Sequence, residues 1–344
     1  MGDVTLLAIG DECDFEAFKK FRRNGLKQKN FIWLNYNKVL SRKLPKIKTS
    51  KLTIFLFFPF DYWNKYIEPK NYKGVYASQK FYDRFAEVCI RIKKSILSSY
   101  KDKIIHYIIQ PDIMYYDRDK KLTLEILKKA RVPTPKVISS RSSNKIMSLA
   151  KKKDLFLKVR YGAMGKGITY LSKDAWLTNF RFKQGKIKSR KSDYGWTFID
   201  MTANDAFLKE LLKQDIVIEE EIKPYIIDNK KFDLRIYISF GKVRHIYPRT
   251  TSMISITTNI SQGGKGEQQS FLKKIPKKML ANAKATAIKA ARAMKTNFAG
   301  VDVMFDNKTK KPVVLEVNVF PGFPKSKSFN LSKKILQDIK SKWK

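Results

Sequence analysis

The stretch Gly300–Phe323 reads Gly-Val-Asp-Val-Met-Phe-Asp-Asn-Lys-Thr-Lys-Lys-Pro-Val-Val-Leu-Glu-Val-Asn-Val-Phe-Pro-Gly-Phe. Two apolar runs, Val301–Phe305 and Val313–Val319, flank a polar Asn-Lys-Thr-Lys segment. Apolar runs of this length around a short polar turn predict a β-hairpin. The rest of the chain is organised around this hairpin.

Oxygen-bearing side chains are placed at regular intervals along the predicted hairpin. Alternation along a strand puts Glu316 and Asn318 on one face, and a turn centred near Thr309 puts Asp302 opposite Glu316. A buried acidic pair normally has a cation, and oxygen ligands without His or Cys suit Mg²⁺. The alternative is a solvent-facing polar stripe, and this stretch alone leaves both interpretations open.

The composition bounds the class of protein. The chain has 344 residues, of which 43% are hydrophobic, so we expect a folded protein of two or three domains. Two cysteines (Cys13, Cys89) and two histidines (His106, His245) leave almost no material for zinc sites or His-based triads. The few cysteines indicate a reducing compartment, and we expect a cytoplasmic protein.

The charge balance is strongly basic, with a formal net charge of +41. Such a charge attracts polyanions, from nucleic acid to acidic peptides. The lysines are spread over the whole length, so a Lys-rich solvated surface explains the charge equally well. We find no signal peptide, and the apolar run Leu52–Phe60 is too short to span a bilayer, so we expect no transmembrane segment.

Residues 1–115 alternate between strand-like and helix-like segments, which predicts a small α/β domain. The predicted strands are Val4–Ile9, Phe31–Leu34, Leu52–Phe58 and Ile104–Ile109, and the predicted helices are Asp14–Arg23 and Tyr82–Leu97.

Residues 116–203 are expected to form a second unit with a glycine-rich loop. Asp119-Lys120 opens a helix that ends before Pro133. The strand Leu155–Arg160 then leads into Tyr161–Gly167, where three glycines leave backbone N–H groups free for phosphate oxygens. The alternative is an ordinary Gly-rich hairpin. The basic segment Phe180–Ile199 predicts an extra hairpin or mobile loop.

Residues 204–344 are expected to form a third unit that contains the opening hairpin. Ile216–Ile222 is a strand that ends in acids, and Phe232–Ile238 alternates with Asp233 and Arg235 on one face. The polar loop Thr257–Gly266 and an Ala-rich helix, Met279–Met294, follow.

In this order, the motifs resemble the ATP-grasp superfamily: Asp-Lys before a helix, a Lys strand with a Gly-rich loop, Asp-x-Arg, Asn…Gly-Gly, Gly-Val-Asp and Glu-x-Asn. The closest resemblance, over roughly residues 117 to 328, is to the ribosomal-protein glutamate ligase (RimK-like) branch. It implies an α/β (α+β) ATP-grasp fold that holds the nucleotide between two α+β subdomains, 116–203 and 204–344, after an N-terminal α/β domain.

The resemblance also implies a role for each matching residue. Lys120 (with Lys121 as second choice) is expected to reach the ATP phosphates, and Lys158 to contact the α-phosphate and the adenine side. Arg235 is expected to face the phosphates, and Arg249 and Asn259 to lie near the γ-phosphate and acyl group. The remaining nucleotide-binding positions are Gly162, Gly165, Lys166, Gly167, Glu219, Glu220, Glu221, Ile222 and Asp233. The metal ligands are Asp302, Glu316 and Asn318, with Glu316 bridging two Mg²⁺ ions, or Mn²⁺ in their place.

The implied activity is that of an ATP-dependent carboxylate–amine ligase that forms an amide through an acyl phosphate and releases ADP and phosphate. Its partners would be ATP, a carboxylate donor and an amine acceptor, an acidic peptide or protein tail among the candidates. The Phe-Pro-Gly-aromatic ending at Phe320–Phe323 also resembles the inositol-phosphate kinase branch, so a kinase of a polyphosphorylated small molecule is the alternative. A non-enzymatic polyanion-binding protein is the second alternative.

Overall fold

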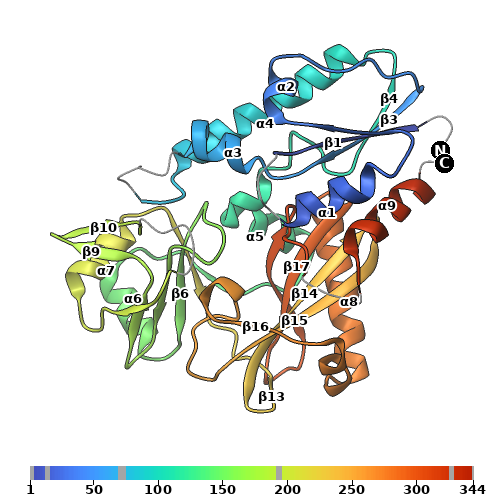
Figure 1. Ribbon diagram of the computed structural model, residues 1–344. Helices are drawn as coiled ribbons and strands as arrows, with labels where there is room; N and C mark the ends of the chain where they lie inside the picture. The colour runs from blue at the N-terminus through green and yellow to red at the C-terminus, as the bar shows by residue number, and fades with distance from the viewer. Residues whose placement is uncertain (1–3, 12–15, 69–74, 191–195, 325–328, 343–344) are drawn as a thin grey trace.

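The computed structural model describes residues 4–11, 16–68, 75–190, 196–324 and 329–342. Within these residues the chain forms three larger β-sheets, a separate two-stranded hairpin and flanking helices (Figure 1). This is the mixed α/β class that the sequence predicts.

The N-terminal sheet is parallel, with the order β2-β1-β3-β4. Its strands are β1 (Val4–Ile9), β2 (Phe31–Leu34), β3 (Lys51–Leu56) and β4 (Ile104–Tyr107). Every residue of β1 is buried, as expected for the centre of a parallel sheet that is covered on both faces. The covering helices include α1 (Glu16–Gly25), α2 (Tyr36–Leu40) and α4 (Gln79–Ser99), followed at the C-terminus by α9 (Leu331–Lys342).

Helix α9 returns to the N-terminal domain, although it lies at the other end of the sequence (Figure 1). Ile335 and Ile339 are buried in the same hydrophobic cluster as Phe21 of α1. Asp338 of α9 accepts hydrogen bonds from Arg244 of β15 (Lys242–Thr251), a strand of the third sheet described below. The C-terminal helix therefore ties two parts of the molecule together. Residues 14 and 15 of the helix predicted at Asp14–Arg23 lie outside the described residues.

The second sheet has the order β11-β8-β7-β6-β12-β5, and its strands pair in the antiparallel sense. The strands are β5 (Val137–Ile138), β6 (Leu155–Val159), β7 (Ile168–Leu171), β8 (Trp176–Thr178), β11 (Ile199–Asp200) and β12 (Ile216–Glu220). Helices α6 (Ser143–Ala150) and α7 (Asp205–Leu212) pack on it. Between β8 and β11, β9 (Arg181–Lys183) and β10 (Lys186–Lys188) form the extra hairpin that the sequence predicts. Residues 191–195 of the predicted segment Phe180–Ile199 lie outside the described part.

The boundary predicted between residues 203 and 204 falls inside this second unit. Strand β12 pairs with β6 and β5, so the sheet continues to Glu220. Helix α5 (Lys120–Lys129) falls within the predicted second unit, but its Leu127 is buried in the hydrophobic core of the third sheet. The reason is pairing and burial: the sequence order of elements does not reveal which sheet each one completes.

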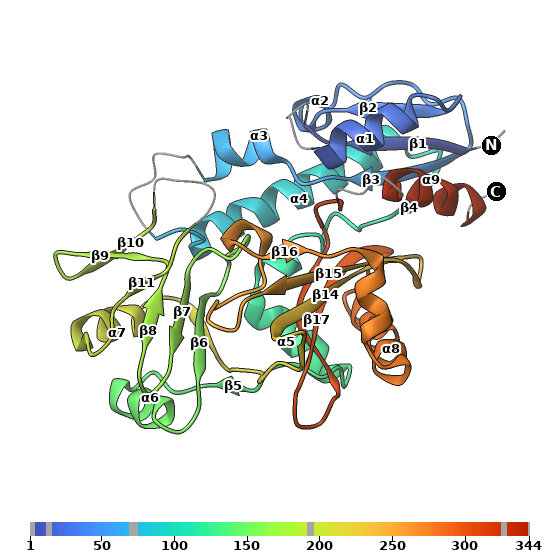
Figure 2. The same cartoon turned by 60° about the horizontal axis from the view of Figure 1, so that its bottom comes forward.

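The third sheet has the order β16-β15-β14-β17-β18, with β13 added to β14. Its strands are β13 (Ile226–Ile227), β14 (Lys230–Ser239), β15 (Lys242–Thr251), β16 (Lys265–Gly266), β17 (Phe298–Phe305) and β18 (Pro312–Asn318). Helix α8 (Lys277–Ala293) covers one face, with buried alanines that allow close packing (Figure 2). The hairpin predicted from Gly300–Phe323 is confirmed, and Asp302 lies directly opposite Glu316 as expected.

Candidate functional site

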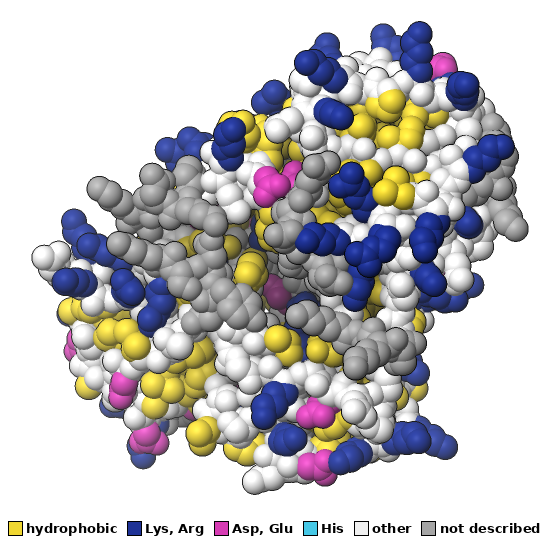
Figure 3. All heavy atoms as spheres, viewed as in Figure 1, with side chains coloured by type: hydrophobic (Ala, Val, Ile, Leu, Met, Phe, Trp, Pro, Cys, Tyr) yellow, Lys and Arg dark blue, Asp and Glu magenta, His cyan; other side chains and the backbone are white. Residues whose placement is uncertain are grey.

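A pocket lies between the second and third sheets, and α5 contributes to its wall. In the space-filling view, a hollow opens near the centre of the molecule with an acidic side chain inside it (Figure 3). Strands β6 and β12 line one side, and β14, β15, β17 and β18 line the other. The pocket is thus built from segments more than a hundred residues apart in the sequence.

One part of the pocket wall is apolar. The side chains that form it come from both sheets, from α5 and from the strand connections: Leu124, Leu127, Pro135, Phe156, Ile168, Ile222, Pro224, Met304 and Leu315. Beside them lie Glu219, Glu220 and Glu221 at the end of β12. An apolar slot with polar groups at its edge is the kind of surface that holds a flat heteroaromatic ring.

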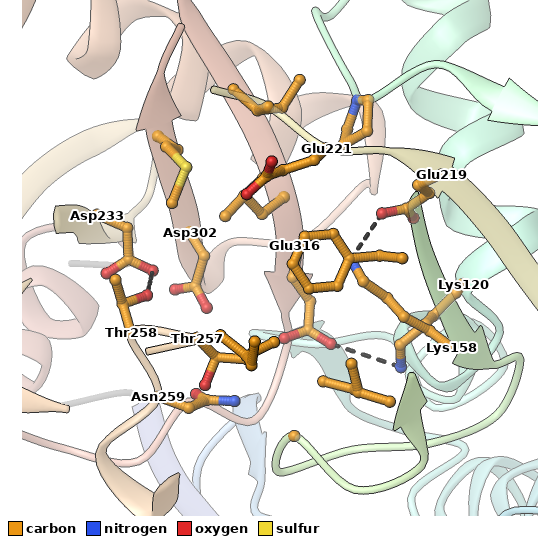
Figure 4. Close-up of a pocket in the computed structure, with 18 of the residues that line it drawn as sticks. Lys120, Lys158, Glu219, Glu221, Asp233, Thr257, Thr258, Asn259, Asp302 and Glu316 are labelled. Carbon is orange, nitrogen blue, oxygen red and sulfur yellow. Dashed lines mark hydrogen bonds and ion pairs between the residues drawn. The ribbon is translucent and has the colours of Figure 1, made fainter. Parts of the chain in front are cut away.

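Two lysines lie on the side of the second sheet, each paired with an acid. Lys158 Nζ lies 2.6 Å from Glu219 Oε2, and Lys120 Nζ lies 3.8 Å from Glu316 Oε1, so Lys120 bridges α5 and β18 (Figure 4). Lys120 also donates to the carbonyl of Gly162 in the glycine-rich loop. Burial lowers the pKa of Lys120, although Glu316 opposes the shift. Lys121, the second choice for the same role, is exposed and does not line the pocket.

On the side of the third sheet, a chain of buried ion pairs connects three strands. Asp233 lies opposite Arg249, and Arg235 lies opposite Asp302. Arg235 donates two hydrogen bonds of 2.7 Å to Asp302, while Arg249 binds Asp233 and lies 3.0 Å from Asp302. Burial opposes the ionisation of Asp302, but the two arginines outweigh it and lower its pKa. Asp233 and Arg235 lie on the same face of β14, but Asp233 pairs with Arg249 on β15 and Arg235 pairs with Asp302 on β17.

The donor atoms fit a magnesium ion. Asp302 and Glu316 both line the pocket and point into it (Figure 4). A carboxylate has about four lone-pair positions, and the arginines use three of those on Asp302, which leaves one for a metal. Within the described residues no three His, Cys, Asp or Glu side chains gather at one point. Two carboxylates are nevertheless enough for Mg²⁺, which keeps several waters and shares substrate phosphates.

The pocket includes most, though not all, of the predicted site residues. Thirteen predicted positions line it: Lys120, Lys158, Gly165, Lys166, Glu219, Glu220, Glu221, Ile222, Asp233, Arg249, Asn259, Asp302 and Glu316. The other four are Gly162, Gly167, Arg235 and Asn318. Of these, Arg235 holds Asp302, and the Asn318 side chain donates to Gly300 O at 3.4 Å.

The glycine-rich loop crosses from the second sheet to the third. Gly165 has a φ of +70°, and its carbonyl accepts a 2.6 Å hydrogen bond from Gln262 in the loop after β15. A Cβ at Gly165 would lie 2.5 Å from the Asn259 side chain, so this approach requires glycine. Lys166 lines the pocket, and its ammonium lies 4.7 Å from the Tyr76 ring centroid and 5.7 Å from that of Trp196. The loop therefore forms part of the pocket lining and bonds to the loop after β15.

Sequence reasoning missed two informative residues. Strict alternation puts Leu315 on the face opposite Glu316, yet both line the pocket because the register shifts between Asp302 and Val303. Asp117 also lines the pocket, and burial raises its pKa to about 6. Its Oδ2 accepts a 3.0 Å hydrogen bond from the backbone of Val319, just beyond β18. A lone acid before the Asp-Lys pair gives no sequence signal of this contact.

Comparison with known proteins shows the same architecture. A family model described as YheC/D like ATP-grasp matches residues 115–343. A probable alpha-L-glutamate ligase from Thioalkalivibrio sulfidiphilus is 32% identical over 111 residues, 32% of each chain. Another, from Legionella pneumophila strain Corby, is 25% identical over 233 residues, 66% of this chain and 64% of the relative. The chain thus spans 32% to 64% of the length of these curated relatives.

Solved structures share the fold over nearly the whole chain. The macrocyclase MdnC from Microcystis aeruginosa MRC, bound with its precursor peptide MdnA, has a TM-score of 0.57 at 11% identity and covers 98% of this chain and 100% of its own. D-alanine–D-alanine ligase from Bacillus anthracis has a TM-score of 0.51 at 14% identity, and the match covers 98% of this chain and 96% of the ligase.

No helix in the described residues is long and apolar enough to cross a membrane.

Proposed function

The chain belongs to the YheC/D-like ATP-grasp family, and from that premise we propose that it is an ATP-dependent carboxylate–amine ligase. The observation that carries the proposal is the pocket between the two sheets, where an apolar slot adjoins the opposed carboxylates of Asp302 and Glu316. Such a site can hold a nucleotide ring at one end and its phosphates at the other. The similarity to probable alpha-L-glutamate ligases supports the same reaction type.

In this proposal the adenine lies in the apolar slot beside Glu219–Ile222, and Lys120 and Lys158 face the phosphates. Asp302, Glu316 and Asn318 would hold Mg²⁺, or Mn²⁺ in its place. The metal would supply charge neutralisation for the transferring phosphoryl group. Arg249 and Asn259 lie beside it on the same wall and would orient the phosphoryl and acyl groups.

The donor carboxylate attacks the γ-phosphate, which gives an acyl phosphate and ADP. The amine then attacks the acyl carbon, the bond to phosphate breaks, and an amide and free phosphate are released. The glycine-rich loop, which lines the pocket and bonds to the loop after β15, would keep water from the activated acyl group. No Cys or His lines the pocket within the described residues, in keeping with a reaction that needs no side-chain nucleophile. We place this ATP-consuming reaction in the cytoplasm.

The test is a screen of ATP turnover by the full chain against amino acids, acidic peptides and inositol phosphates, with products identified by mass. Lys158→Ala should weaken ATP binding far more than adenosine binding, because the charge of Lys158 would face the phosphates. Lys121→Ala is the matched control, since Lys121 is exposed and lies outside the pocket lining. Equal losses for ATP and adenosine would place Lys158 away from the phosphates and count against the proposal.

A further inference from the structure

The acids that line the pocket differ in whether they have a cationic partner. Six of them lie within 4 Å of a lysine or arginine nitrogen: Glu219, Glu220, Glu221, Asp233, Asp302 and Glu316. Asp117 is the exception, since no lysine or arginine of the described chain forms an ion pair with it. A buried carboxylate without a cation is costly, so this difference requires an explanation.

The side chain of Asp117 is fixed by one of its two oxygens. Its Oδ2 accepts the backbone N–H of Val319, while its Oδ1 is buried and has no hydrogen-bond partner. The contact with Val319 fixes the carboxylate one residue beyond Asn318, at the end of the predicted metal hairpin. The carboxylate is therefore positioned by the fold, and one of its two oxygens has no hydrogen-bond partner in the described residues.

The adjacent arginine does not neutralise Asp117 by direct contact. The Arg118 guanidinium lies 4.1 Å from the Phe58 ring centroid and 5.5 Å from that of Trp63, both in the N-terminal domain. Its Nε is also buried without a hydrogen-bond partner. Arg118 stacks on these rings of the N-terminal domain, so it and Lys120 attract the Asp117 carboxylate without forming an ion pair, and burial outweighs them and raises the pKa of Asp117.

We propose that Asp117 binds the ammonium group of the acceptor amine. This inference rests on the proposed ligase function and names the amine subsite within it. The turn that carries Asp117 leads directly into α5, where the three parts of the molecule meet (Figure 1). The acceptor is thus an aliphatic amine that carries a proton in solution, such as an amino acid or a peptide amino group.

The role of Asp117 is to hold and orient the nitrogen. In the step that follows, the C–N bond forms, the acyl C–O bond to phosphate breaks, and the oxygen leaves with its electron pair as phosphate. The bound ammonium loses two protons overall, one to the departing phosphate and one to solvent. The hydrogen bond to a carboxylate is charge-assisted, so its loss should weaken binding of the amine by about 10- to 100-fold.

The first test needs no turnover. The melting temperature of the full chain is measured in methylammonium chloride and in sodium chloride at equal ionic strength. We expect methylammonium to raise it for the native protein and not for Asp117→Asn, whose amide oxygen can still accept from Val319. Asp112→Asn is the control, because this nearby half-exposed acid pairs with Lys93 and the variant should keep the native response. No response in the native protein, or an equal response in Asp117→Asn, overturns the proposal.

The same variant separates binding from two other roles. Without ligand, Asp117→Asn should melt at a higher temperature, because a buried charge without a cation is removed; a lower temperature would make Asp117 a structural acid and overturn the proposal. A shift in the Mg²⁺ concentration for half-maximal ATP turnover would make it a metal ligand instead. With any amine found in the screen, the KM for the amine should rise about 10- to 100-fold while the KM for ATP stays nearly constant.

Failure of this inference is distinguishable from failure of the proposed function. If no amine stimulates ATP use while the methylammonium response persists and depends on Asp117, the ligase proposal fails and the ammonium site stands. If amine-dependent ATP use is found and Asp117→Asn leaves the KM for the amine unchanged, the ligase stands and the subsite fails.

Discussion

Two β-hairpins of this chain place charged residues directly opposite one another, and they balance those charges in opposite ways. In β17–β18, Asp302 faces Glu316, and both acids are matched by cations from Arg235, Arg249 and Lys120. In β9–β10, cation faces cation: Lys183 lies opposite Lys186, and Arg181 opposite Lys188. Like charges in opposed positions destabilise a hairpin unless something neutralises them.

The β9–β10 hairpin is held by its other face. Phe182 packs against Phe207 of α7 with ring centroids 5.6 Å apart, and Ile187 is buried. Its four cations are exposed, and none forms an ion pair with the described chain. Lys and Arg side chains gather on the edge of the molecule where these strands lie (Figures 1 and 3). In the β17–β18 hairpin, which we call the pocket hairpin, the charges are neutralised by other side chains of the chain. The charges of β9–β10 would instead be neutralised by an anion from outside.

The largest expected effect comes from removing Glu316, one of the two opposed acids of the pocket hairpin. Glu316→Ala should lower ATP turnover by about 100-fold or more, since the metal it would hold supplies several kcal/mol of charge stabilisation. The fold should persist, as judged by circular dichroism, because Glu316 is about a third exposed. Near-normal turnover of the variant at saturating Mg²⁺ would remove Glu316 from the metal site.

A second variant breaks the buried ion pairs behind the same hairpin. Arg249→Met should reduce the free energy of unfolding by about 3–5 kcal/mol, because it leaves Asp233 and Asp302 with less compensation. Urea unfolding measures this change. The exposed pair Lys274–Asp228 is the reference, and Lys274→Met should change stability by less than about 1 kcal/mol. Equal effects of the two variants would show that burial does not decide the strength of these pairs.

The β9–β10 hairpin is tested by neutralising its cations. Replacing its four cations, Arg181, Lys183, Lys186 and Lys188, with glutamine should weaken binding to a poly-glutamate peptide and flatten the salt dependence of that binding. The matched control replaces four exposed lysines on and before α8: Lys273, Lys277, Lys278 and Lys284. If both quadruple variants lose the same affinity, the net charge of +41 is responsible and the hairpin has no special role.

A smaller effect concerns Asp11 in the N-terminal domain, an acid outside both hairpins. Burial raises the pKa of Asp11 from 3.8 to about 6, against hydrogen bonds from the backbone of Asp61 and Tyr62. The folded state therefore binds this proton more tightly than the unfolded chain, so the contribution to stability is present at low pH and is lost as the pH rises through about 6.

Asp11→Asn should accordingly stabilise the protein at pH 7.5, on the order of 1 kcal/mol after allowance for solvent screening, and have little effect at pH 4. The fully exposed Asp102 is the control position, and Asp102→Asn should change little at either pH. Thermal unfolding at the two pH values gives the answer. A gain for Asp11→Asn that is independent of pH would contradict the assigned cause.

Much of the pocket hairpin could be predicted from sequence, because its signals are local. The polar turn sets the register, and alternation then places Asp302 opposite Glu316. The order of motifs from Lys120 to Asn318 predicts the family and thirteen of the residues that line the pocket. Local pattern and family resemblance agree here because the same residues carry both.

Contacts between distant segments could not be predicted in this way. The cation partners of Asp302 come from β14 and β15, the bulge that turns Leu315 into the pocket leaves no trace in the pattern, and Asp117 meets Val319 across 202 residues. The membership of β12 in the second sheet depends likewise on pairing with β6. Such features follow from how sheets assemble, which one sequence does not show.

The central claim is that the pocket between the second and third sheets is where a carboxylate is joined to an amine. The most direct measurement is the ratio of inorganic phosphate to ADP released with whichever substrates stimulate ATP use, together with the mass of the product. A ligase releases both in equal amounts, requires an amine as well as a carboxylate, and gives a product lighter than the two substrates by one water. ADP without matching phosphate, and a product heavier by one phosphoryl group, would contradict the ligase and establish a kinase.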